Sequence, residues 1–145
     1  MIRHLRADDW DDWQELWQGY LRFYREELAP AVTRSTFDRL SAGADQMFGL
    51  VAERPGGGLA GFANALLHPS TWTTTAYCYL EDLFVEPASR GTGTARLLVE
   101  AVAEEARRRS AVKVYWHTQE FNGRARSLYE QVARNVSFAV YEMPL

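Results

Sequence analysis

Hydrophobic residues recur along the chain with two different periods, which divide it into strands and helices. Short or alternating apolar runs predict strands over residues 2–6, 47–54, 59–68, 74–85, 112–118 and 136–143. Spacings of three and four predict helices from Trp10 to about Tyr24, from a cap at Ser35 to about Ala42, from about Thr94 to Ser110, and over residues 122–133. This order favours a single α+β (α/β) domain, residues 1–145, built around a mixed sheet.

Length, charge and cysteine content narrow the functional class without identifying it. The 145 residues are 47% hydrophobic and carry a formal net charge of −3. Without a basic stripe we expect no nucleic-acid partner, and without a long uncharged apolar run or an apolar leader we expect neither a membrane span nor a signal peptide. Cys78 is the only cysteine, so the cytoplasm is the expected compartment. It shares no ligand spacing with the histidines, so we expect no metal site.

A glycine-containing turn separates the strand ending near Val85 from the long helix that follows. It reads Arg-x-x-Gly-x-Ala, from Arg90 through Gly93 to Ala95. Small residues let a ligand approach the backbone, and the start of a helix offers unpaired N–H groups with a partial positive charge. The turn is therefore either an anion cradle or an ordinary tight turn with a helix cap.

Two adjacent acids, Glu81 and Asp82, interrupt the most strand-like run of the sequence. Because a strand alternates its faces, we expect the two side chains to point in opposite directions, one of them toward a cleft. Burying a carboxylate without a partner is unfavourable, so their position calls for a reason. The alternative is that one acid is exposed to solvent while the other pairs with an arginine.

Four segments in a fixed order carry a resemblance to a known family. The strand YLEDLFV, the turn RGTGTA, the strand VYWHT and the helix NGRARSLY together resemble the GNAT family of N-acetyltransferases. Parts are similar to the histone-and-polyamine acetyltransferase subgroup and to the spermidine/spermine acetyltransferases. The resemblance implies a strongly twisted mixed sheet, splayed between the fourth and fifth strands, with helices on both faces. Many members have a glycine after the last helix, and this chain has none there.

The resemblance also implies an acetyl-CoA site. The turn that would hold the pyrophosphate consists of Arg90, Gly91, Thr92, Gly93, Thr94 and Ala95. The strand before it would pair its backbone with the pantetheine arm through Leu83, Phe84 and Val85. The pattern Asn-x-x-Ala-x-x-x-Tyr matches Asn122, Ala125 and Tyr129. Asn122 would contact the cofactor arm, and Tyr129 would protonate the departing thiolate.

Acetyl transfer to an amine needs a base, because alkyl amines are protonated at neutral pH. Glu81 is the first candidate, through a water molecule, and Asp82 is the second; either acid can instead serve to attract a cationic substrate. We expect direct attack by the amine while both substrates are bound. Cys78 as an acetyl carrier is a weaker alternative, and His117 is either a proton relay or a structural histidine at a strand end.

The acceptor itself is less well specified. The aromatic stripe of the first helix, Trp10 to Tyr24, can belong to the core or can line a substrate site. We expect Tyr20, Tyr24, Trp72 and Glu81 to contact the acceptor, because rings and carboxylates suit an amine cation. A polyamine or another small primary amine is favoured. The alternatives are a protein lysine or N-terminus, an aminoglycoside or amino acid, and a non-catalytic acetyl-CoA-binding module. We also expect a homodimer.

Overall fold

One mixed sheet organises the structure, a computed structural model that describes residues 1–145. The strands lie in chain order across the sheet: β1 (Ile2–His4), β2 (Met47–Glu53), β3 (Leu59–His68), β4 (Ala76–Val85) and β5 (Ala111–Tyr115). Neighbouring strands are antiparallel except β4 and β5, which are parallel. The helices are α1 (Trp10–Tyr24), α2 (Pro30–Ala42), α3 (Thr94–Arg108) and α4 (Gly123–Val132). The predicted α+β class with a mixed sheet is confirmed.

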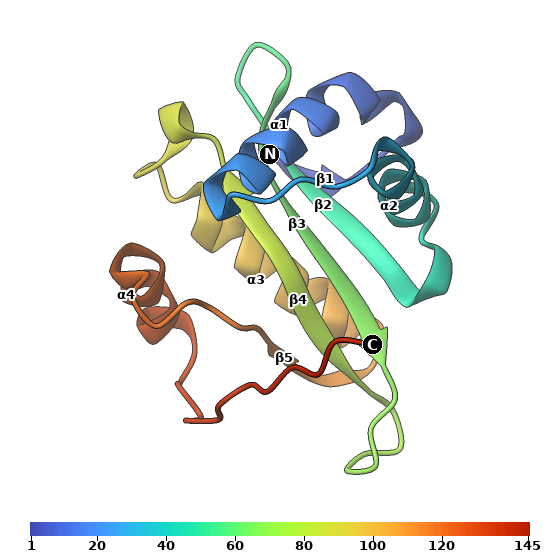
Figure 1. Cartoon of the computed structure of the whole chain (residues 1–145), viewed down its shortest axis with the longest axis vertical. Helices are drawn as coiled ribbons and strands as arrows, with labels where there is room; N and C mark the ends of the chain where they lie inside the picture. Colours follow the sequence, from blue (N-terminus) through green and yellow to red (C-terminus); the bar gives the residue numbers. More distant parts are fainter.

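Helices cover both faces of the sheet, with α1 and α2 on one face and α3 on the other (Figure 1). The layer under α3 is mostly aliphatic, with Leu80, Leu98 and Val102 at its centre. The layer under α1 and α2 is rich in rings, including Trp13 and Trp17, both buried. Most of the predicted aromatic stripe of α1 is therefore core.

The second helix begins earlier than the sequence suggested. Pro30 is the first residue of α2, and Ser35, the expected cap, lies inside the helix. Proline suits the first position of a helix, because its fixed φ is helical and its missing N–H would have had no intrahelical partner.

The last expected strand, residues 136–143, does not form. Residues 134–145 have no regular secondary structure, and Ser137 has a left-handed φ of 59°, which interrupts an extended backbone. An extended segment is stable as a strand only when its backbone pairs with a neighbour, and this segment pairs with none. Its apolar side chains are consequently exposed, among them Phe138 and Tyr141.

Candidate active site

Strand β4 has two halves with different neighbours. Its paired half, Ala76–Tyr79, lies between β3 and β5, and its last pairing with β5 joins Tyr79 to Tyr115. Its open half, Leu80–Val85, continues with only β3 beside it. The sheet is thus splayed between β4 and β5, as the resemblance implied, and the open half presents a free backbone edge.

The two acids lie at a β-bulge within the open half. Ala65 of β3 pairs with Leu80 and Asn64 pairs with Asp82, which leaves Glu81 as an extra residue without a partner on β3. A bulge breaks the alternation of a strand and turns a side chain to a new direction. The expectation that Glu81 and Asp82 point in opposite directions is therefore wrong, since both line one cavity.

Asp82 is held by two side chains from other elements. The Tyr20 hydroxyl of α1 donates to one carboxylate oxygen at 2.6 Å, and the Asn64 amide of β3 donates to the other at 3.0 Å. Burial raises the pKa of Asp82 above its usual range, although both hydrogen bonds act against this shift. Burial and the neighbouring carboxylate also raise the pKa of Tyr20, so its hydroxyl stays protonated and can donate. Asp82 is therefore fixed in position.

Glu81 is freer than its neighbour, with an exposed side chain and no hydrogen bond. Partial burial and the charge of Asp82 raise the pKa of Glu81, while the charge of Arg39 lowers it in part. A raised pKa makes a carboxylate a better proton acceptor. Of the two acids, Glu81 is the more exposed to a substrate or a water molecule.

A cavity of about 770 Å³ opens in front of these acids, between α1, α2, β3 and β4. Tyr20 and Tyr24 of α1 line it together with Glu81 and Asp82. Trp72 does not: it lies in the loop before β4, is 87% exposed and is absent from this lining. The lining also contains side chains that sequence reasoning missed, namely Arg39, Asn64 and Gln119.

The turn after β4 has the open shape that an anion cradle requires. Gly91 and Gly93 have φ values of 80° and 84°, and a Cβ at either position would meet no atom within 4 Å. The first helical hydrogen bond of α3 runs from the Leu97 N–H to the Gly93 carbonyl. The N–H groups of Thr94, Ala95 and Arg96 precede it and have no intrahelical acceptor. This helix start can therefore bind a phosphate group.

Arg90 and Thr92 shape the same turn. The Arg90 Nε donates to the Val85 carbonyl at 3.1 Å, which fixes the side chain beside the end of β4 and leaves its terminal nitrogens without a protein acceptor. The Thr92 hydroxyl donates to the Ser89 carbonyl at 2.7 Å and lies 2.8 Å from the Thr94 hydroxyl. A guanidinium with free donors beside a helix N-terminus fits a pyrophosphate.

Helix α4 carries the third part of the expected cofactor site. Asn122 caps this helix, because its side-chain oxygen accepts from the Ala125 N–H at 3.3 Å. The Tyr129 ring packs edge-on against Trp116 at a centroid distance of 5.3 Å. Burial, with a smaller contribution from Tyr24, raises the pKa of Tyr129 to about 12. Tyr129 therefore keeps its proton at neutral pH and can act as an acid.

Cys78, the alternative acetyl carrier, and His117, the candidate proton relay, both lie outside the cavity. Burial raises the pKa of the Cys78 thiol to about 11, so this thiol is protonated at neutral pH and is a poor nucleophile. His117 is exposed, and its Nδ1 lies 3.3 Å from the Tyr79 hydroxyl. Both residues are absent from the cavity lining, as is Tyr129, which lies on α4.

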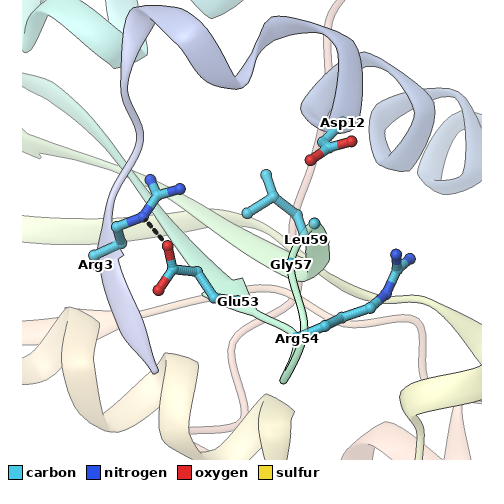
Figure 2. Close-up of a pocket in the computed structure, with 7 residues that line it drawn as sticks. Arg3, Asp12, Glu53, Arg54, Gly57 and Leu59 are labelled. Carbon is cyan, nitrogen blue, oxygen red and sulfur yellow. Dashed lines mark hydrogen bonds and ion pairs between the residues drawn. The ribbon is translucent and has the colours of Figure 1, made fainter.

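A second, smaller hollow of about 250 Å³ lies over the turn between β2 and β3 (Figure 2). Its Arg3 pairs with Glu53 at 2.6 Å and with Asp9 at 2.7 Å, and its Arg54 pairs with Glu86. The charged groups that could hold a ligand are thus largely paired within the protein. No group of three or more His, Cys, Asp or Glu side chains could hold a metal ion, and none of the helices has the length and hydropathy of a membrane span.

Comparisons with known proteins show which sequences and folds this chain is similar to. A sequence profile described as "Acetyltransferase (GNAT) family" matches residues 4–133. The D-amino-acid N-acetyltransferase HPA3 of Saccharomyces cerevisiae is 30% identical over 143 residues, 98% of this chain and 89% of that protein. The thialysine N-epsilon-acetyltransferase of Caenorhabditis elegans is 38% identical over 63 residues, 43% of this chain and 39% of that protein. The crystal structure of a ribosomal-protein-alanine N-acetyltransferase from Brucella melitensis biovar Abortus 2308 has the same fold. Its TM-score is 0.83 at 23% identity, covering 100% of this chain and 99% of that one.

Proposed function

The chain belongs to the acetyltransferase (GNAT) family and is an N-acetyltransferase that uses acetyl-CoA, and on that premise we propose that its acceptor is a small primary amine. One observation carries the proposal. The bulge brings Glu81 and Asp82 into a single cavity of about 770 Å³, on the same strand whose open half leads to the cradle at Gly91 and Gly93. A proton acceptor and an anion site at the two ends of one open edge suit transfer between two bound substrates.

The donor side of the proposed site lies along the open half of β4 and the turn after it. The backbone of Leu83, Phe84 and Val85 would bind the pantetheine arm, and an N–H group there would polarise the thioester carbonyl. The pyrophosphate would be held by Arg90, Gly91, Thr92, Gly93, Thr94 and Ala95. Asn122 and Ala125 would lie beside the arm, at the start of α4. Acetyl-CoA supplies the acetyl group as a thioester, and the acceptor amine takes it directly while both are bound.

Two side chains would handle the protons of the reaction. Glu81 takes a proton from the acceptor ammonium, directly or through a water molecule, so that the neutral nitrogen can form its bond to the acetyl carbon. Tyr129 gives its proton to the sulfur as the carbon–sulfur bond breaks, and its pKa of about 12 keeps that proton available. Asp82, held by Tyr20 and Asn64, is the second candidate for the base and adds negative charge that attracts the ammonium.

The names of the relatives narrow the choice of acceptor. Two relatives found by sequence are named as a D-amino-acid and a thialysine N-acetyltransferase, and both of those acceptors are small amines. The cavity, lined by Tyr20, Tyr24 and two acids, can stabilise an ammonium group by charge and by ring contacts. Polyamines share this chemistry and remain candidates, as does a lysine side chain or N-terminus of a protein.

The test is thiol release from acetyl-CoA with a panel of acceptors, comprising spermidine, D- and L-amino acids, a lysine peptide and an aminoglycoside. We expect turnover with at least one small amine that clearly exceeds turnover with the peptide. A chain that acetylates the peptide most efficiently would contradict the small-molecule proposal, and silence with every amine would contradict acetyl transfer to amines altogether.

We propose further that the chain is a cytoplasmic homodimer. Residues 136–145 expose Phe138, Tyr141 and Met143, and β5 has no strand on its outer side. Exposed apolar residues and an unpaired sheet edge both favour pairing with a second copy. The lone free Cys78 suits a reducing compartment. Light scattering should give twice the 16.6 kDa mass of one chain, and the mass of a single chain at working concentration would contradict the dimer.

A further inference from the structure

One cation faces the acids across the acceptor cavity. Arg39 of α2 is the only basic side chain in the lining, which also contains four acids: Glu26, Asp45, Glu81 and Asp82. Its charge reaches Glu81, because it lowers the pKa of that carboxyl against the opposing effect of burial. The cavity therefore has an acidic side on β4 and a basic group on α2.

Arg39 is weakly engaged by the protein. Its Nε donates to the Ser35 carbonyl of its own helix at 3.4 Å, and its one ion pair is a 4.0 Å contact with the exposed Asp45. A guanidinium has five N–H donors in a planar fork that matches a carboxylate, so most of this capacity is unused. Arg34, five residues earlier on α2, forms a tighter 3.0 Å pair with Asp38 and is absent from the cavity lining.

We propose that Arg39 binds a carboxylate of the acceptor, which makes the acceptor an amino acid whose ammonium lies at Glu81 and Asp82. This inference rests on the proposed function and names the substrate class of the same site. A zwitterion presents a cationic group to the acids of β4 and an anionic group to Arg39. The remaining lining includes Leu21, Leu28, Met47 and Leu66, which can receive an apolar side chain. A polyamine offers no anion to Arg39.

The test compares acceptors that carry or lack this charge, in the wild type and in Arg39 variants, so that the change in preference between proteins reports on Arg39. D- and L-leucine are compared with the corresponding leucinamides, in which an uncharged amide replaces the carboxylate. The kcat/KM for each compound is measured by thiol release. We expect the preferred leucine enantiomer to exceed its amide by about 10- to 100-fold, the range of a charge-assisted hydrogen-bonded pair. Arg39→Gln should remove that preference, mainly through KM, and Arg39→Lys should restore part of it. Arg34→Gln, on the same helix outside the cavity, should leave the preference intact.

Two results would overturn the inference and leave acetyl transfer standing. One is equal use of leucine and leucinamide by the wild type, together with efficient acetylation of spermidine. The other is an Arg39→Gln variant in which leucine and leucinamide lose the same factor, because the arginine would then shape the helix instead of binding charge. Absence of thiol release with every amine would instead contradict the proposed function, and with it the inference.

Discussion

The two halves of β4 share one strand but differ in what surrounds them. The paired half, Ala76–Tyr79, has a strand on either side, and its Cys78 is fully buried against α3. The open half, Leu80–Val85, has a partner on one side only, a bulge at Glu81 and a glycine turn at its end. Complete backbone pairing leaves nothing for a ligand to bind, whereas a free edge with irregular backbone offers both donors and space. Stability should therefore depend on the first half and turnover on the second.

The largest loss of turnover should follow a substitution at the bulge residue Glu81. Glu81→Gln removes the proposed base with little change in shape, and kcat should fall by about 10²- to 10⁴-fold, the usual contribution of general base catalysis. Tyr79→Phe, two residues earlier in the paired half, is the matched control and should keep wild-type turnover. Steady-state thiol release measures both. Equal rates for Glu81→Gln and the wild type would exclude Glu81 as the base and direct attention to Asp82.

The pH dependence of kcat/KM should also distinguish Glu81 in the open half from Tyr79 in the paired half. A base must be deprotonated to act, so kcat/KM should rise with pH through the pKa of Glu81. Burial and Asp82 raise that pKa, so the acid limb should lie at higher pH than an ordinary glutamate would give. Glu81→Gln should abolish this limb, and Tyr79→Phe should retain it. A limb unchanged in Glu81→Gln would assign the titration to another group.

A substitution in the glycine turn at Gly91 and Gly93 should have a smaller effect, on acetyl-CoA binding. Gly93→Ala places a methyl group at a φ of 84°, where a phosphate would approach the helix start, and should weaken acetyl-CoA binding by about 10- to 100-fold. Gly56→Ala, at φ 93° in the turn between β2 and β3, is matched in its positive φ and in its open surroundings. Both variants should lose similar stability, but calorimetric titration should show weaker binding only for Gly93→Ala. Equal weakening would mean that backbone strain, not the cradle, sets affinity.

The smallest effect on turnover should be that of Cys78→Ala in the paired half. Removing a buried sulfur should lower the free energy of unfolding by about 1 kcal/mol, measured by chemical denaturation, because it leaves a small void between β4 and α3. Turnover well below the melting temperature should stay at the wild-type level. Loss of turnover in the folded variant would indicate an acetylated cysteine and contradict direct transfer.

Much of the fold could be predicted because local patterns specify it. The aromatic spacing of α1 and the apolar run of β4 are visible without tertiary contacts, and the glycines before Thr94 mark the turn. The bulge could not be predicted, because it is set by the register between Asn64 and Asp82, on two strands. An alternation rule applied to β4 alone therefore placed Glu81 and Asp82 on opposite sides.

The same limit applies to the residues that no local pattern marks. Arg39 reads as an ordinary surface residue of α2, and only the packing of α2 on the sheet brings it to the cavity. Trp72 was expected to contact the acceptor but lies outside the cavity. Its sequence position in a loop does not specify the direction in which that loop turns. The segment 136–143 has the alternation of a strand, but a strand also requires a partner edge, which a sequence pattern cannot supply.

The most direct test of the account is thiol release by Tyr129→Phe with the best small-amine acceptor. This change removes only the hydroxyl proposed to protonate the sulfur, and acetyl-CoA affinity, measured in parallel, should stay within a few-fold of the wild type. The account predicts that kcat falls by about 10²-fold or more, because the thiolate then leaves without a proton donor. An unchanged kcat in a variant that still binds acetyl-CoA would contradict the assignment of Tyr129 and of the site built around it.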